Sequence, residues 1–229
     1  RYWIYNRFFN KLWNHYNWDW KCSYNHIEQH QHPNSNFNGS GTDNVGVRVA
    51  SGGTISTTSG TITISNATGS TSGTTGCHGI LVDGANSRIS AATGAINLTG
   101  TGNGSGATNR GIQVSAAGAI TSSSTAPITL TGTGSVAGSS SNEGIFITGT
   151  SSSITAANAA IQLTGTAGGG TTDGITIDNG GAVLTTPTSG NITANATGRI
   201  SLLAGASGSA RMSTTNGNIS ATASGLLVL

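Results

Sequence analysis

One unit of about 30 residues recurs along this chain, and each copy opens with a glycine followed by apolar residues at alternate positions. The copies begin at Gly46, Gly79, Gly111, Gly144 and Gly174, at successive offsets of 33, 32, 33 and 30 residues. Internal periods of about 20 to 50 residues are typical of solenoids and repeat arrays. The recurrence therefore constrains the fold more than any single motif does.

Apolar residues keep fixed places in every copy: a leading pair, one central residue and a trailing pair. They are Val47/Val49, Ile55 and Ile62/Ile64; Ile80/Val82, Ile89 and Ile96/Leu98; Ile112/Val114, Ile120 and Ile128/Leu130; Ile145/Ile147, Ile154 and Ile161/Leu163; Ile175/Ile177, Val183 and Ile192. Alternate spacing and β-branched residues are typical of strands, and the Gly, Ser, Thr, Ala and Asn between them favour tight turns. Each copy therefore predicts three short strands joined by turns.

Strands this short cannot bury an apolar face alone, but stacked copies of one unit can bury it together. We predict an all-β fold, a right-handed parallel β-helix (a solenoid) with about 30–33 residues and three short strands per coil. The apolar residues would point inward and form ladders along the axis. A β-sandwich is the alternative, but sandwich strands do not repeat a three-strand cassette.

The sequence divides into three regions. Residues 39–192 are predicted to be β-helix repeats, and residues 193–229 to be less regular coils. The chain ends on four apolar residues after Gly225, so we expect a fragment that continues into further repeats of the same chain. Residues 1–38 differ from both, because they hold all four Trp, all four Tyr and three of the four Phe.

Three interpretations of residues 1–38 stay open: a folded aromatic-rich cap, a domain of another origin, or the same repeat translated out of frame. We favour the third. Asn, Asp, His and Tyr codons read one base later become Thr, Ile or Met codons, and the Trp codon becomes a Gly codon. Residues 14–21, NHYNWDWK, then read as the Ile/Thr and Gly runs of the repeats. We expect this aberrant segment to be poorly ordered, and its coding DNA tests the hypothesis.

Charge is sparse after residue 38, where five arginines balance five acidic residues. The net charge of +2 therefore comes from residues 1–38, and it predicts no nucleic-acid partner. No apolar run approaches the roughly 18 residues of a membrane span, and the chain shows no export signal. The four histidines and Cys22 of the first segment have no zinc-ligand spacing, and Cys77 reads as a small turn residue. We predict no metal and no cofactor.

Charged residues directly before the leading glycines form the candidate site: His78, Arg110, Glu143 and Asp173. They should stack across coils about 4.8 Å apart, so that Arg110 and Glu143 pair at the surface. An enzymatic interpretation takes Glu143, Asp173 and Asp178 as a carboxylate cluster. The repeats offer no aromatic wall and no Lys, so we interpret the row as solvated charge and predict that the chain is not an enzyme. We assign no catalytic, cofactor-binding or metal-binding residue.

Residues between the inward pairs should face outward in rows. One row is Arg48, Leu81, Gln113, Phe146 and Thr176, and another is Thr63, Asn97, Thr129, Gln162 and Thr193. Neither is uniform, which argues against the flat threonine array of an ice-binding solenoid. Asp83 and Asp178 share one repeat position, but three coils separate them.

Strands such as GAINLTG, in a nearly uncharged chain rich in Ser, Thr and Gly, resemble the repeat regions of large bacterial exoproteins. These are the filamentous-haemagglutinin-like and autotransporter passenger adhesins, and the resemblance covers residues 39–229. It implies a secreted or bacterial cell-surface protein, exported across the outer membrane, in which the repeats act as a structural stalk. The variable loops would contact host or environmental glycans or surface proteins. The alternative is a glycan-binding or glycan-cleaving β-helix module of the pectin-lyase-like type.

Overall fold

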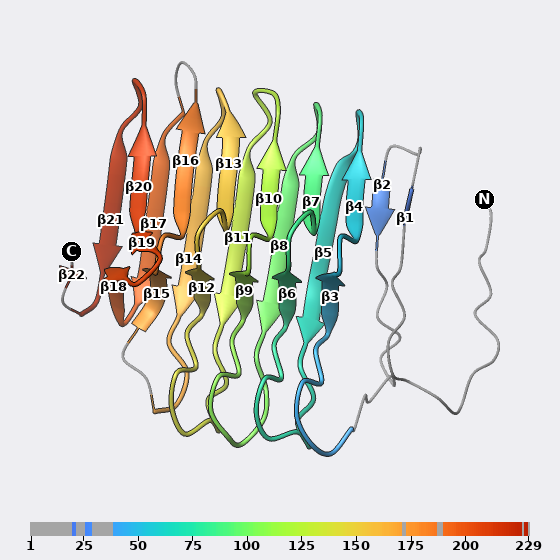
Figure 1. The fold of residues 1–229 in the computed structure, drawn as a ribbon, viewed down its shortest axis with the longest axis vertical. Helices are drawn as coiled ribbons and strands as arrows, with labels where there is room; N and C mark the ends of the chain where they lie inside the picture. Colours follow the sequence, from blue (N-terminus) through green and yellow to red (C-terminus); the bar gives the residue numbers. More distant parts are fainter. Residues whose placement is uncertain are drawn as a thin grey trace.

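A computed structural model describes residues 20–21, 26–28, 39–170, 173–186, 190–225 and 227–228. All regular secondary structure in these ranges is β-strand. Three sheets built mainly of parallel strands stack as a solenoid of about five turns, with three strands in each coil (Figure 1). The predicted all-β, three-strand parallel solenoid is confirmed.

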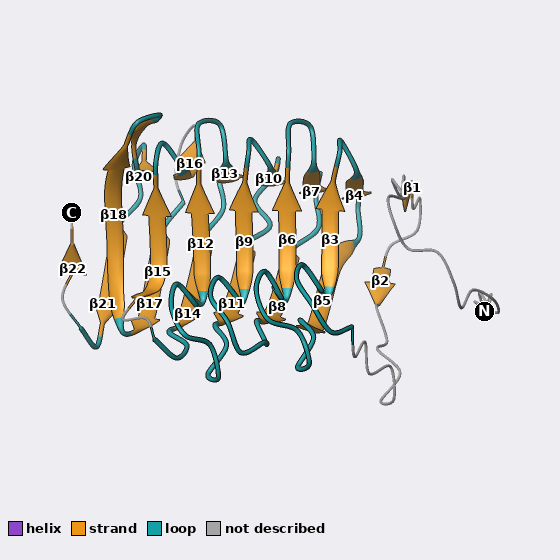
Figure 2. Cartoon of the chain, turned by 60° about the horizontal axis from the view of Figure 1, so that its bottom comes forward, coloured by secondary structure: helices purple, strands orange, loops and turns teal. Residues whose placement is uncertain are grey.

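Each sheet takes one strand from every coil. The leading sheet holds β3 (Val47–Ala50), β6 (Ile80–Asp83), β9 (Ile112–Ser115), β12 (Ile145–Thr148), β15 (Asp173–Asp178) and β18 (Arg199–Gly205), with β19 (Gly208–Ser209) antiparallel and β22 (Leu227–Val228) parallel to β18. The middle sheet holds β1 (Trp20–Lys21), β4 (Thr54–Thr57), β7 (Arg88–Ala91), β10 (Ala119–Ser122), β13 (Ser153–Ala157), β16 (Ala182–Thr186) and β20 (Arg211–Thr214). The trailing sheet holds β2 (His26–Glu28), β5 (Thr61–Thr68), β8 (Ile96–Thr101), β11 (Ile128–Thr133), β14 (Ile161–Thr166), β17 (Ile192–Thr197) and β21 (Ile219–Ala223). Figure 2 shows the strands of the leading sheet side by side.

The core is a set of aliphatic ladders that run along the axis. In the middle coil, Ile112 lies opposite Ile80 and Ile145, and Ile128 lies opposite Ile96 and Ile161. All of these side chains are fully buried. Each contributes roughly 1.5–3 kcal/mol on burial, so the repeated pattern supplies most of the stabilisation. The predicted inward positions of the first five coils are all in this core, although Ile55 is only partly buried.

Glycine recurs at two places in each coil because the chain passes close to itself at one corner. Gly132 ends its trailing-strand motif, and a Cβ there would overlap the carbonyl oxygen of Gly144. A Cβ on Gly144 would in turn overlap the backbone nitrogen of Thr166. The leading glycine of one coil thus packs on the trailing glycine of the coil before, which explains why both recur in the sequence.

Two short strands lie within residues 1–38, at residues that the sequence pattern does not mark as strands. Ile27 of β2 lies opposite Ile62, and Trp20 of β1 lies opposite Ile55. They add one strand to the trailing sheet and one to the middle sheet. The other residues of this segment lie outside the described part of the chain, and the out-of-frame origin stays a hypothesis for the coding DNA to test.

The last described coil departs from the repeat at the corner between the leading and middle sheets. Met212 follows Leu202 at an offset of ten positions. The matching residues of the earlier coils, such as Ile177 and Val183, are six or seven positions apart. The extra residues form the β18–β19 hairpin. This hairpin is the one antiparallel pairing among the described strands.

Candidate functional site

Most charged residues of the described repeats gather on the outer face of the leading sheet. They lie in the row before the leading glycines and at the ends of the strands: Arg48, Asp83, Arg110, Glu143, Asp173, Asp178 and Arg199. The predicted pairing of Arg110 with Glu143 is confirmed by a salt bridge, and a second salt bridge joins Asp173 to Arg199, a residue outside the predicted row. The outer face of the leading sheet is therefore the main candidate site for catalysis or binding.

Arg110 and Glu143 form a buried pair rather than the surface pair expected from the sequence. Nε of Arg110 lies 2.6 Å from Oε2 of Glu143, and the two side chains are only 11% and 9% exposed. The guanidinium also stacks on the ring of Phe146, 3.9 Å from its centroid. Long side chains thus lie along the sheet and cover one another. The prediction of a solvated charge row is wrong for these residues.

Hydrogen bonds continue the pair across the sheet to a second carboxylate. Nη1 of Arg110 donates to Oε1 of Gln113 at 2.8 Å, and Nε2 of Gln113 donates to Oγ of Ser115 at 3.1 Å. Ser115 then donates to Oδ1 of Asp83 at 2.8 Å. The outward row through Gln113 and Phe146 has the predicted register. However, its members Leu81 and Thr176 are buried and not exposed as expected.

Asp173 is held by a two-pronged contact with Arg199. Nε and Nη2 of Arg199 donate to the two carboxylate oxygens at 2.6 and 3.1 Å, and the hydroxyl of Ser201 adds a third hydrogen bond at 3.0 Å. This contact raises the pKa of Arg199, chiefly through the hydrogen bond to Asp173. A carboxylate engaged in this way is occupied as an acceptor and poorly placed to activate water.

The three carboxylates of the enzymatic interpretation have separate environments. Glu143 pairs with Arg110, Asp173 pairs with Arg199, and Asp178 lies at the end of β15. Asp83 and Asp178 share one row, and the register places β9 and β12 between their strands, as expected from the sequence. Two of the three carboxylates are thus engaged by arginines, which differs from the arrangement of a catalytic carboxyl pair.

His78, the first member of the row, is buried and neutral. Its Nδ1 accepts a hydrogen bond from the backbone N–H of Arg110 at 3.3 Å. Burial, together with the nearby cations of Arg110 and Arg48, lowers the pKa of His78 from 6.5 to about 3. The imidazole is therefore not a general acid near neutral pH, and its solvated character predicted from the sequence is wrong.

This buried histidine predicts a specific pH dependence of stability. The folded chain keeps His78 neutral down to about pH 3, while the unfolded chain protonates it below about 6.5. The free energy of unfolding should therefore fall as the pH is lowered through this window, by up to about 1.4 kcal/mol per pH unit from this group. Denaturant melts of the wild type and His78→Gln at pH 4 to 7.5 measure the difference. Parallel pH profiles for the two proteins would contradict the assignment.

The variable loops between the trailing and leading sheets are stacked from coil to coil. The backbone N–H of Cys77 donates to Oδ1 of Asn109, and the backbone N–H of Asn109 donates to Oδ1 of Asn142, both at 2.8 Å. Both asparagines are fully buried. Backbone bonds such as Ser139 to Gly106 tie the loop tips together as well. Sequence reasoning missed this ladder, although an Asn two residues before the leading glycine in two successive copies was a visible signal.

The described residues offer neither an accessible thiol nor a cluster of metal ligands. Cys77 is buried, and its thiol is in contact with the carbonyl oxygen of Thr75 at 3.7 Å. Within the described ranges no three His, Cys, Asp or Glu side chains gather closely enough to hold a metal ion. The histidines of the first segment, apart from the backbone of His26, lie outside these ranges.

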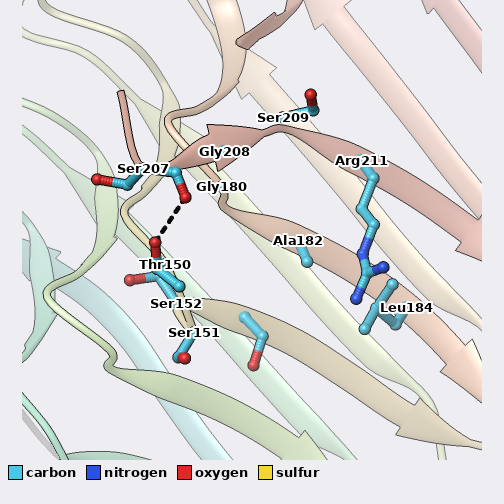
Figure 3. Close-up of a pocket in the computed structure, with 11 residues that line it drawn as sticks. Thr150, Ser151, Ser152, Gly180, Ala182, Leu184, Ser207, Gly208, Ser209 and Arg211 are labelled. Atoms are coloured by element: carbon cyan, nitrogen blue, oxygen red, sulfur yellow. Dashed lines mark hydrogen bonds between the residues drawn. The ribbon is translucent and has the colours of Figure 1, made fainter. Parts of the chain in front are cut away.

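A pocket of about 410 Å³ lies against the outer face of the middle sheet, under the β18–β19 hairpin (Figure 3). The turn before β13 supplies hydroxyl groups on one side, β16 supplies Ala182 and Leu184, and Arg211 of β20 lies on the far side. The repeat pattern in the sequence does not predict this pocket. The longer spacing between Leu202 and Met212 was the signal that one corner is built differently.

No protein-family model, no curated protein and no solved structure matches this chain. The part of the chain that the structure describes also holds no helix that could cross a membrane. The fold places the chain in the class of parallel β-solenoids.

Proposed function

We propose that this chain is a stalk segment of a secreted or cell-surface bacterial protein of the adhesin type, a rigid spacer without chemistry of its own. The observation that carries the proposal is that the buried apolar and charged side chains of the repeats contact one another within the stack. Aliphatic ladders fill the axis, and the buried charges of the leading sheet pair with each other. Such a column is held by neighbour contacts alone and can be extended by adding coils.

The loops that a binding module would use support the same proposal. They are fixed by the Asn109–Asn142 ladder and by bonds between loop backbones. Adhesive loops need exposed anchor residues, typically aromatic side chains or arginine. The most exposed large apolar side chain of the described residues is Val136, 81% accessible in one of these loops. One exposed valine is a much smaller contact than the aromatic or arginine anchors that binding loops typically use.

The rival proposal, adhesion through the loops, is tested with coated beads. Beads carrying the chain and beads carrying Val136→Ser are exposed to host-type cells and to immobilised glycans. The stalk proposal expects equal retention of the two bead types, because the loops around Val136 contribute no binding. Specific retention that Val136→Ser or a Gly/Ser replacement of residues 135–140 abolishes would overturn it.

An enzymatic role is tested with the carboxylate that has the fewest structural contacts. The full chain should release no reducing ends from polyuronate or neutral polysaccharides, because Glu143 and Asp173 are occupied by arginines. Asp178→Asn is the informative variant, since it leaves both salt bridges intact. Cleavage by the wild type that disappears in folded Asp178→Asn would contradict the proposal and favour the glycan-cleaving alternative.

A further inference from the structure

The pocket under the β18–β19 hairpin breaks the regularity of the column. Every other described corner between the leading and middle sheets is a short turn, but here the chain extends into a hairpin that leans back over two earlier coils (Figure 3). A regular stack needs no such insertion. The hairpin adds a wall to one open face of the middle sheet, and the half-open pocket beside it is of the size that small ligands occupy.

Two side chains from different coils hold the hairpin in place. The hydroxyl of Thr150 donates to the carbonyl oxygen of Ser207 at 2.8 Å, and Oδ1 of Asn179 accepts from the backbone N–H of Ser207 at the same distance. Both backbone groups of Ser207 are thus fixed to the coils below. The wall of the pocket is therefore built before any ligand arrives, which lowers the entropy cost of binding.

Arg211 is the only charged residue that lines the pocket, and it differs from the arginines of the leading sheet. Arg110 and Arg199 each contact a carboxylate, whereas Arg211 makes no ion pair within the described part of the chain. Its side chain extends along Leu184, and its guanidinium stays accessible (Figure 3). A planar guanidinium of this kind matches a carboxylate or sulfate group through two parallel hydrogen bonds.

The rest of the lining fits a sugar ring. Thr150, Ser151, Ser153 and Ser209 offer accessible hydroxyl oxygens, while Ala182 and Leu184 form a small apolar surface beside them. A pyranose carries hydroxyl groups around its edge and C–H groups on its faces, so it has partners of both kinds here. We propose that this pocket binds a single sugar unit that bears one anionic group, a carboxylate or a sulfate.

Three probes that share the galactose ring distinguish recognition of a carboxylate, recognition of a sulfate and recognition of the uncharged sugar. Galacturonate, galactose 6-sulfate and galactose are titrated against the full 229-residue chain, with saturation-transfer NMR as the readout. For one sugar unit we expect a dissociation constant on the order of 1 mM for at least one anionic probe. Galactose should bind about 10-fold more weakly or worse, because it lacks the charge-assisted contact. The relative affinities of the two anionic probes identify the preferred group.

Arg88 provides a matched control. It occupies the same row of the middle sheet as Arg211, is exposed, and has no hairpin above it. Arg211→Gln should weaken binding of the anionic probe about 10-fold or more, and Arg88→Gln should leave it unchanged. Thr150→Val should weaken binding as well, because it releases the hairpin without altering a charge.

Several results would overturn the proposal. They are equal binding of galactose and the anionic probes, equal losses in Arg211→Gln and Arg88→Gln, or no binding of either anionic probe at about 50 mM, well above the expected constant. None of them bears on the stalk, because the pocket and the loops tested with Val136→Ser lie at different corners of the coil.

Discussion

Ile128→Asp is expected to lower the free energy of unfolding by several kcal/mol, because it places an unpaired carboxylate in an apolar ladder. Ile128 is fully buried in the middle coil, with Ile96 on one side and Ile161 on the other. In a one-dimensional stack a central coil depends on both neighbours, so damage there interrupts the column rather than fraying one end.

Its neighbour Thr129 is the matched control. It lies between Asn97 and Gln162 in the outward row and is partly exposed, so Thr129→Asp should change stability by about 0.5 kcal/mol or less. Urea melts of the wild type and the two variants measure the effects. The opposite order of effects would mean that the inward and outward faces are exchanged.

Arg110→Met is the second large effect, with an expected loss of about 3–5 kcal/mol, because it leaves the Glu143 carboxylate buried without its cation. The same substitution removes the stacking on Phe146 and the hydrogen bond to Gln113. Guanidinium-induced unfolding measures the loss. Arg88→Met removes an exposed arginine from a neighbouring sheet and should change stability by about 0.5 kcal/mol or less.

Two further variants distinguish the cost of leaving a buried charge unpaired from the net contribution of the Arg110–Glu143 ion pair to stability. Arg110→Met combined with Glu143→Leu should recover most of the loss, since a well-packed apolar pair replaces a buried ion pair at little cost. Arg199→Met breaks the more exposed pair with Asp173 and should cost less than Arg110→Met. Equal losses for Arg110→Met, Arg199→Met and Arg88→Met would contradict the buried character of the Arg110–Glu143 pair.

The ladders were predictable from the sequence because a period of two specifies which side of a strand each residue occupies. Ile112 and Ile128 were placed inward on that basis, and both are fully buried. The same pattern cannot tell how far a long side chain lies along the outer face. Arg110 was therefore expected in solvent, whereas it lies flat over Phe146 and reaches Gln113.

The pocket was hidden from the sequence for a different reason. Its residues come from three coils, and they meet only because Ser207 is bound to Thr150 and Asn179. Serines and threonines are abundant in this chain, so those that line the pocket carry no distinguishing signal. The spacing before Met212 marks an insertion, but the direction in which the insertion folds is set by these two tertiary hydrogen bonds.

Distances between spin labels along one outward row test the solenoid most directly. Thr63, Gln162, Thr193 and Ser220 belong to one row of the trailing sheet, three, four and five coils apart from the first. With Cys22 and Cys77 replaced by serine, pairs of labels are attached at Thr63 and at each of the other three positions, and their separation is measured by double electron–electron resonance. The mean distance should rise by about 4.8 Å per coil, from about 14 Å through 19 Å to 24 Å. A distance that does not increase from the Thr63–Gln162 pair to the Thr63–Ser220 pair would contradict the stacked coil.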